Sequence, residues 1–322
     1  MSLEYQILIA LALDLLIGDP RWFPHPVRLM GKLALRLEGP ARRLIRYSSI
    51  SGALVVVILV GLAAVVTWSL VYWSKSVHPA LGDLVSVFFL YTGLAMRDMV
   101  RHSTDVYQAL ITGPLTEARQ KVGMMCGRDT DQLDEASVTR AAVESVAENM
   151  VDGVTAPLFY AVIAGPVGIM AYKAVNTLDS TFGYRNEKYR EFGWAAARLD
   201  DVANFIPARL TAILLPLAAR ILGERASAAF WIFLRDGGKH PSPNAGQTEA
   251  AVAGALGLQL GGVSFYGGQM SNKPTLGDPV EAPAPGHIMR ANALLVVTTG
   301  FFLWLMLAAR AMVAQIGEGL FV

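Results

Sequence analysis

The sequence predicts an all-α integral membrane protein, a polytopic helical bundle whose broken or re-entrant helices surround a cytoplasm-facing polar site. Apolar residues make up 53% of the 322 residues, and charged residues only 16%. Residues 50–73 and 291–309 carry no charged side chain, and each run is close to the roughly 20 residues that cross a hydrocarbon core. Residues 144–209 are apolar yet rich in ionisable and amide side chains, which indicates a functional site.

The charges of the first connections predict the orientation of the chain. Residues 3–17 are expected to form a retained first span, because they lack the basic region and cleavage site of a signal peptide. Seven Lys or Arg lie in residues 18–49, against a single lysine in residues 74–83. The positive-inside rule therefore makes the first loop cytoplasmic. We expect a multi-pass protein of the inner (cytoplasmic) membrane whose active site faces the cytoplasm.

The middle of the chain predicts interrupted helices. Residues 154–175 are apolar enough to insert but include Pro157 and Pro166. If this segment crossed as one straight span, the acidic groups on its two sides would lie on opposite faces of the membrane. A broken or re-entrant helix that lines a cavity removes this conflict and is the favoured interpretation. Two prolines interrupt residues 205–222 in the same way.

The domain organisation is predicted to be simple, with one membrane-embedded catalytic domain over residues 1–322. Its cytoplasm-facing site segments would be 97–153 and 176–204, and the Pro and Gly of residues 263–290 predict a loop. Residues 249–260 predict a helix whose small residues, spaced four apart, suit close helix packing. We prefer that structural interpretation to a ligand-binding role for this helix.

Three carboxylates are predicted to share one face of the helix before Gly153. Glu144, Glu148 and Asp152 are spaced at i, i+4 and i+8, and like charges at this spacing repel each other. A cation is therefore expected opposite them, either Mg²⁺ or an Arg or Lys side chain. The alternative interpretation is a solvated acidic face on a cytoplasmic helix.

A second set of carboxylate and amide side chains follows, which comprises Asn176, Asp179, Asp200, Asp201 and Asn204. Oxygens of this kind are hard ligands that Mg²⁺ takes, usually together with phosphate oxygens. Arg128, Arg198 and Arg209 accompany these acids, and arginine binds phosphate or carboxylate in a bidentate manner. The alternative is a set of structural salt bridges in a polar core.

Several functional classes are excluded or disfavoured by composition. A net charge of +1 without a basic stripe interleaved with aromatics argues against nucleic acid as a partner. The single Cys126 excludes an internal disulfide and a cysteine-based metal cluster. No P-loop, dinucleotide-binding or zinc-protease motif is present. His25 and His240 each lie beside proline, and we interpret both as hydrogen-bonded loop residues.

Longer strings follow one another in a fixed order along the chain. They are GDP (18–20), HPVR (25–28), GRDT (127–130), ESVAEN (144–149), APLFY (156–160), AYKAVNTLDS (171–180), ARLDDVAN (197–204), PAR (207–209), SPN (242–244), AGALGLQLGG (253–262) and KP (273–274). From about residue 14 to residue 278, the chain thereby resembles the CbiB/CobD family of cobalamin biosynthesis, the adenosylcobinamide-phosphate synthases.

The resemblance implies an integral membrane enzyme that joins the amine of 1-aminopropan-2-ol, usually as its O-phosphate, to a propionate carboxylate of adenosylcobyric acid. ATP would drive amide formation with Mg²⁺, most simply through an acyl phosphate. Membrane lipid would be a further partner, and the resemblance is compatible with a homo-oligomer or a complex with other late enzymes of the cobalamin pathway.

The charged and amide residues receive roles on this basis. The catalytic candidates are Asp200, Asp201 and Glu144, with Asp200 or Asp201 as the base. The metal ligands are Glu148, Asp152 and Asp179. The ATP or phosphate contacts are Arg128, Asp129, Lys173, Asn176, Arg198, Asn204, Arg209 and Asn244.

Two other classes fit the residue pattern without the resemblance. Intramembrane prenyltransferases hold Mg²⁺ and a diphosphate with acidic and amide clusters, as NTLD (176–179) and DDVAN (200–204) could do. A transporter of anionic substrates would use broken helices around Pro157 and Pro166 to form a site near the midplane. The absence of an internal repeat that pairs two halves argues against the transporter.

Overall fold

The computed structural model describes residues 1–20, 22, 25–184 and 186–319, and it describes side chains up to residue 315. Helices dominate, and the described residues form one small two-stranded sheet. The predicted all-α membrane fold is therefore confirmed. The chain separates into two compact units. Unit 1 comprises Met1–Ala95, Ala156–Asn204 and Met306–Val322; unit 2 comprises Met96–Thr155 and Phe205–Leu305.

Four helical stretches of the described chain are long and apolar enough to cross a membrane, and they are Ser48–Val77, Pro79–Thr112, Glu135–Phe182 and Gly286–Gln315. The first and last contain the two uncharged runs at 50–73 and 291–309, so both predicted spans are confirmed. The consecutive helices Trp194–Ala203 and Phe205–Ile221 would add a fifth span if they cross together. The predicted first span is helix α1 (Leu3–Ile17), but its 15 residues fall short of the length of these candidates.

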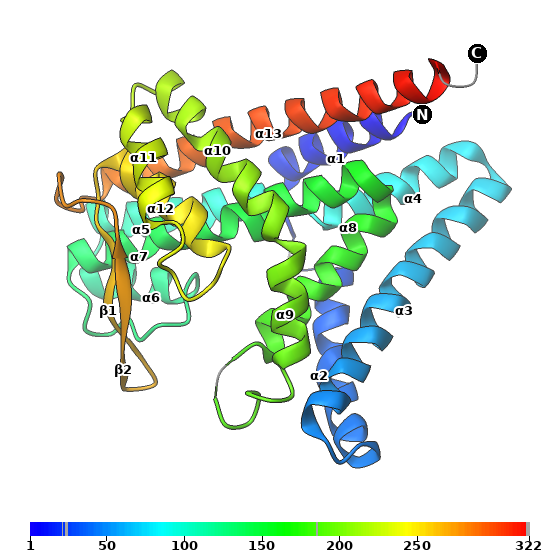
Figure 1. The fold of residues 1–322 in the computed structure, drawn as a ribbon, viewed down its shortest axis with the longest axis horizontal. Helices are drawn as coiled ribbons and strands as arrows, with labels where there is room; N and C mark the ends of the chain where they lie inside the picture. Colours follow the sequence, from blue (N-terminus) through cyan, green and yellow to red (C-terminus); the bar gives the residue numbers. More distant parts are fainter. Residues whose placement is uncertain (21, 23–24, 185, 320–322) are drawn as a thin grey trace. The chain divides into compact units, whose positions relative to one another are not determined.

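Unit 1 is built around α3 (Ser48–Val77). This helix packs against α2 (Pro26–Leu44), α4 (Pro79–Thr92) and α8 (Ala156–Phe182), as the blue and green ribbons of Figure 1 show. Helix α9 (Trp194–Ala203) packs against α3 and α8.

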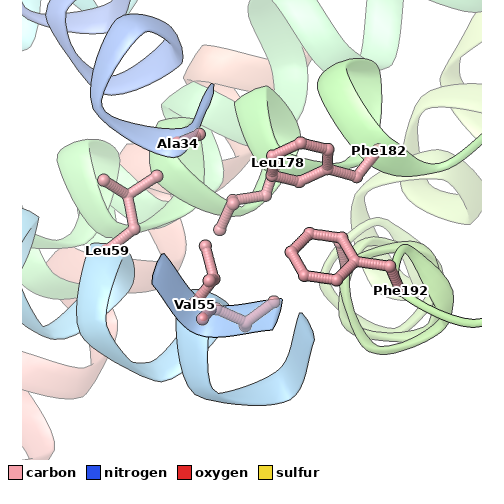
Figure 2. Close-up of a cluster of buried hydrophobic side chains, with 9 residues drawn as sticks. Ala34, Val55, Leu59, Leu178, Phe182 and Phe192 are labelled. Atoms are coloured by element: carbon pink, nitrogen blue, oxygen red, sulfur yellow. The ribbon is translucent and has the colours of Figure 1, made fainter. Parts of the chain in front are cut away.

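A cluster of buried apolar side chains joins four helical regions of unit 1. Phe182 meets Phe192 edge-on with ring centroids 5.0 Å apart, and Val55 of α3 lies beside Phe192, whereas Leu59 lies nearer Ala34 (Figure 2). Gly52 lies so close to the main chain of Phe192 that an added Cβ would sit 1.9 Å from its carbonyl oxygen. The connector between α8 and α9 is thereby fixed against α3.

Helix α8 is broken inside the predicted segment 154–175. Ala164 has φ −132° and ψ 19°, and Gly165 has a positive φ of 61° that a residue with a side chain would adopt only with strain. Pro166 follows and has no N–H to continue the hydrogen-bond ladder. The predicted broken helix is confirmed, and its cause is this Gly-Pro step.

Unit 2 contains most of the remaining elements. They are α5 (Met96–Thr112), α6 (Leu115–Gly123), α7 (Glu135–Met150), the π-helical turn η1 (Val151–Thr155), α10 (Phe205–Ile221), α11 (Ala226–Asp236), α12 (Ala245–Leu256), β1 (Leu260–Tyr266), β2 (Gln269–Leu276) and the first part of α13 (Gly286–Gly319). Every residue of α12 is buried, and the helix packs against α7, α10 and α11.

The small residues of α12 do allow close packing, although the helix is shorter than predicted. A Cβ at Gly254 would meet the carbonyl oxygen of Ala228 on α11 at 2.5 Å, so the predicted role of this glycine is confirmed. The helix ends at Gly257, whose φ of 68° forms a left-handed cap. Gly261 lies beyond this cap in β1. The prediction that the helix continues to residue 260 is therefore wrong.

The predicted loop over residues 263–290 contains instead most of a β-hairpin and the start of α13. Strands β1 and β2 pair antiparallel, and Tyr266 faces Gln269 across a two-residue turn (orange in Figure 1). Gly267 and Gly268 both have positive φ, as the tight turns favoured in hairpins require. The Gly-Gly step was the signal for a hairpin, and the overall Pro and Gly content of the segment obscured it.

Candidate active site

The predicted site residues fall into both units. Unit 2 holds Arg128, Asp129, Glu144, Glu148, Asp152, Arg209 and Asn244. Unit 1 holds Lys173, Asn176, Asp179, Arg198, Asp200, Asp201 and Asn204.

Helix α7 carries the first two carboxylates. Asp134 caps the helix by accepting a hydrogen bond from the backbone N–H of Ser137 at 2.8 Å. Glu144 is buried and accepts two hydrogen bonds, one from Arg128 at 2.5 Å and one from the backbone N–H of Gly261 at 2.7 Å. The alternative of a solvated acidic face is therefore wrong at Glu144. The predicted cationic partner is confirmed in the form of an arginine.

The Arg128–Glu144 ion pair is almost closed off from solvent, with side-chain exposures of 9% and 6%. Burial opposes the charge of Arg128, but the nearby Glu144 carboxylate outweighs it and raises the pKa of the guanidinium. Nε of Arg128 is buried and has no hydrogen-bond partner among the described residues. One donor of this arginine thus remains free beside the pair.

Glu148 lies one helical turn beyond Glu144 and is solvent-accessible. Its carboxylate makes no hydrogen bond or ion pair with any described residue, although Lys273 and Arg128 act on it electrostatically. Opposite α7, the buried Glu249 of α12 feels the charges of both Glu148 and Glu144. Burial, followed by these two carboxylates, raises the pKa of Glu249 well above its usual range.

Asp152, the third carboxylate of the predicted acidic face, lies just beyond the end of α7. The helix gives way to η1 at Val151, and Asp152 is the second residue of that π-helical turn. A π-helix forms i→i+5 bonds, so the i, i+4 spacing that joins Glu144 to Glu148 does not by itself fix the direction of Asp152. A further carboxylate near Glu144 and Glu148 comes from Glu249 of α12.

His240 completes the polar groups near Glu249. Its Nδ1 accepts a hydrogen bond from the backbone N–H of Ser242 at 3.0 Å, so the proton of the neutral ring sits on Nε2. Nε2 is buried, lies 3.9 Å from Oε1 of Glu249 and has no hydrogen-bond partner in the described parts of the chain. Burial and the charge of Lys273 lower the pKa of His240 to about 4, so the ring is neutral at pH 7.

Strand β2 contributes Lys273 to the same group. Burial opposes its charge, but Tyr266, Glu249 and Glu148 raise the pKa of the ammonium. We call Glu144, Glu148, Glu249, Arg128, Lys273 and His240 the mixed-charge cluster. Three carboxyl groups, two cations and a neutral imidazole are thus near one another in unit 2.

Asp129 fixes the hairpin that carries Lys273. Its two carboxylate oxygens accept hydrogen bonds from the backbone N–H groups of Gly267 and Gly268, at 2.9 and 2.7 Å. Its own backbone N–H donates to the carbonyl of Phe265. This predicted phosphate contact therefore has a structural partner at the hairpin turn.

Arg209 and Asn244, two further predicted contacts, meet in unit 2. The guanidinium stacks on the ring of Phe205 and donates to Oδ1 of Asn244 at 3.3 Å. It also donates to the carbonyl of Pro243 at 3.4 Å. These contacts tie the segment between His240 and α12 to α10.

In unit 1, Asp200 is the centre of a buried group of amides. It accepts hydrogen bonds from Asn204 at 2.9 Å and from Asn176 at 3.5 Å. The hydroxyl of Tyr172 donates to Oδ1 of Asn204, and its ring stacks on that of Tyr160. Asn176, Asp200 and Asn204, which lie up to 28 positions apart, are therefore brought together as predicted.

The other predicted residues of unit 1 differ in exposure. Arg198 pairs with Asp201 at 3.3 Å on the surface of α9, so this pair fits the alternative of a structural salt bridge. Lys173 is buried within α8, and Asp179 lies near the end of the same helix. No group of three or more His, Cys, Asp or Glu converges as metal ligands among the described residues. The assignment of Mg²⁺ ligands stays a prediction.

Three members of the mixed-charge cluster were not among the predicted site residues. Glu249 lay in a helix interpreted as purely structural, His240 was interpreted as a loop residue, and Lys273 lay in an expected loop. An acidic residue within an otherwise apolar, small-residue helix was the available signal for Glu249.

Comparisons with known proteins agree with the ordered strings. A sequence model of the family described as "CobD/Cbib protein" matches residues 7–295. Cobalamin biosynthesis protein CobD of Geobacter metallireducens is 50% identical over 275 residues, which cover 85% of this chain and 86% of that protein. The CobD protein of Leptospira interrogans serovar copenhageni is 46% identical over 297 residues, 92% and 94% of the two chains. Cobalamin biosynthesis protein CbiB of Salmonella typhi is 44% identical over 308 residues, 94% and 96% of the two chains. No solved structure matches. The chain belongs to the CobD/CbiB protein family.

Proposed function

We propose that the protein catalyses amide formation in cobalamin biosynthesis, joining 1-aminopropan-2-ol, as its O-phosphate, to a propionate carboxylate of adenosylcobyric acid with ATP and Mg²⁺. Its role in cobalamin biosynthesis follows from the family. The specific amide-forming reaction is supported by one observation, the mixed-charge cluster of unit 2. This cluster offers both a hydrogen-bond acceptor, Glu148, and donors, Lys273 and His240, to a ligand.

An amino-alcohol phosphate carries an ammonium group and a phosphate, so its site needs both an acceptor and donors. Glu148 has no hydrogen-bonding partner in the described chain and would accept from the ammonium. Lys273 and the free Nε2–H of His240 would donate to phosphate oxygens. Glu144 is already satisfied by Arg128 and Gly261, so its proposed part is to hold Arg128 in place.

The residues of the cluster also fit Mg²⁺ in a limited way. Magnesium is usually held by one or two carboxylates together with water and substrate phosphates, so it does not require a cage of three side chains. Glu148 is a free carboxylate of this kind, and its two oxygens would serve the ion and the substrate ammonium together. When bound, the ion would neutralise phosphate charge during activation of the carboxylate by ATP.

Amide formation also requires a proton acceptor for the amine. Asp200 and Asp201 remain the proposed bases, and the two carboxylates differ in their surroundings. Asp200 is buried and accepts from two amide donors, whereas Asp201 is half-buried and paired with Arg198. Asp200 is therefore the better oriented candidate, with Asn176 and Asn204 as its positioning residues.

The test is turnover by the detergent-purified chain with adenosylcobyric acid, aminopropanol phosphate, ATP and Mg²⁺, with the amide product and ADP measured. Glu148→Gln should lower kcat/KM for the amine by about 10- to 150-fold, as expected when a charged partner of the substrate is removed. Glu135→Gln, at the exposed start of the same helix, is the matched control and should leave turnover unchanged.

Two results would overturn the proposal. Wild-type protein that forms no amide and consumes no ATP would favour the prenyltransferase or the transporter. Equal activity of the Glu148→Gln and Glu135→Gln variants would leave the reaction in place but remove the mixed-charge cluster as the amine site.

A further inference from the structure

A basic cavity in unit 1 is separate from all the predicted site residues. Its volume is about 1070 Å³, and it is lined by the end of α2, the start of α3 and the connector before α9. The charged residues of the lining are Arg42, Arg46, Lys188, Arg190, Glu187 and Glu191. Tyr47 and Trp194 supply aromatic walls.

We propose that this cavity binds the phosphate headgroup of an anionic membrane phospholipid. Its place along α3 is the first reason. The cavity includes Ser48 and Ser49, where the 30-residue apolar span begins, and only 28% of the span's most apolar window is buried within the protein. Most of α3 therefore faces lipid, and its first turn lies where hydrocarbon gives way to headgroups.

The aromatic side chains also indicate that the cavity lies at the level of the lipid headgroups. Tyr47 is 71% exposed and Trp194 is 57% exposed, although both line the cavity. Exposed Tyr and Trp concentrate at the headgroup level of membranes, where the ring meets lipid and the polar atom meets water. No side chain caps the N-terminus of α3, so backbone N–H groups of its first turn are left for a phosphate oxygen.

The cations of the lining are of two kinds. Arg42 is fixed by Glu38 at 3.0 Å, by Ser48 at 3.1 Å and by the carbonyl of Lys188 at 2.9 Å. Lys188 is held by Glu38 and Tyr189. The side chains of Arg46 and Arg190 are exposed and make no hydrogen bond or ion pair in the described part of the chain. These two arginines are free to bind a ligand.

The balance of charge selects the headgroup. Four cations and two carboxylates line the cavity, which leaves a net charge of +2. Glu38, beneath Arg42 and Lys188, reduces this to +1. A headgroup with a single net negative charge, such as phosphatidylglycerol, matches this balance, whereas the choline of phosphatidylcholine would add a cation. Basic pockets beside membrane spans bind anionic headgroups for this reason.

The test is native mass spectrometry of the full chain in detergent, titrated with phosphatidylglycerol, with phosphatidylcholine and with inorganic phosphate. Wild-type protein should prefer phosphatidylglycerol to phosphatidylcholine by about 10-fold or more. Arg46→Ala/Arg190→Ala should weaken phosphatidylglycerol binding by roughly 25-fold, since each cation near a headgroup contributes about fivefold. Arg36→Ala/Arg43→Ala removes the same charge from exposed positions of α2 outside the cavity and should change affinity less than about twofold.

Each contrary result identifies another explanation. Equal weakening by both double variants would mean non-specific attraction, and the absence of a preference for phosphatidylglycerol would exclude a headgroup site. Displacement of the lipid by millimolar inorganic phosphate would make free phosphate the ligand. A photoactivatable phosphatidylglycerol on the unaltered chain provides a second readout. Crosslinks should concentrate near Trp194, and crosslinks spread evenly along α3 would overturn the proposal.

Discussion

Nε2 of His240 lies 3.9 Å from Oε1 of Glu249, and both side chains are buried in unit 2. The distance is too long for a hydrogen bond, and Nε2 has no other partner among the described residues. The N–H of a neutral ring therefore points toward the mixed-charge cluster without an acceptor. A buried donor left in this state costs free energy, which a ligand oxygen would recover.

The pKa of His240 predicts how stability depends on pH. The pKa is about 4 in the folded protein and about 6.5 in the unfolded chain. Between these values the unfolded chain binds a proton that the folded protein does not, so stability falls as the pH drops from 6.5 to 4, by up to about 3 kcal/mol. Above pH 6.5 the histidine contributes no pH dependence.

The variant His240→Asn isolates this effect, because asparagine offers an acceptor to Ser242 but does not titrate. Its melting temperature should fall less than that of the wild type between pH 7.5 and pH 5. Identical pH slopes for the two proteins would show that His240 is not the group responsible.

The Arg128–Glu144 pair predicts strong coupling between two substitutions. Removal of one partner leaves the other charge buried, so Arg128→Met or Glu144→Gln alone should cost about 3–5 kcal/mol of unfolding free energy. The double variant should cost clearly less than the sum of the two single variants. Denaturant unfolding of all four proteins measures the coupling, and additive losses would contradict a direct pair.

Asp129 should control the mobility of the hairpin turn. Asp129→Asn leaves one acceptor where two backbone N–H groups donate, and hydrogen bonds to a charged group contribute about 1.5–3 kcal/mol. Amide hydrogen exchange at Gly267 and Gly268 should become about 10-fold faster or more. Asp131→Asn, on an exposed residue two positions away, is the control and should leave the rates unchanged. Unchanged exchange in Asp129→Asn would argue against this contact.

Two glycines of α3 should respond oppositely to alanine. At Gly52 the new Cβ would collide with the backbone of Phe192, and we expect a loss of about 1–3 kcal/mol. At Gly61 nothing lies within 4 Å, so alanine should be neutral or stabilise the helix by up to about 1 kcal/mol. Thermal unfolding in detergent compares the two, and similar melting temperatures would refute the close approach at Gly52.

The sequence by itself determined the membrane class, two spans and the break in α8. These features depend on local properties, since an uncharged run of sufficient length needs no partner to be recognised, and the proline of a Gly-Pro step removes a hydrogen bond from the helix that contains it. It also determined that Glu144 and Glu148 share a helical face, because an i, i+4 spacing fixes their relative direction.

Only the tertiary structure decided which side chains join them. Glu249 and Lys273 are more than 100 positions away from Glu144, and their approach depends on how α12 and the hairpin pack beside α7. Asp152 lies in the π-helical turn η1 and not in α7, and the spacing of the three carboxylates gave no sign of this change. Arg128 became the partner of Glu144 because a buried carboxylate requires a nearby donor, and no spacing rule indicates which arginine supplies it.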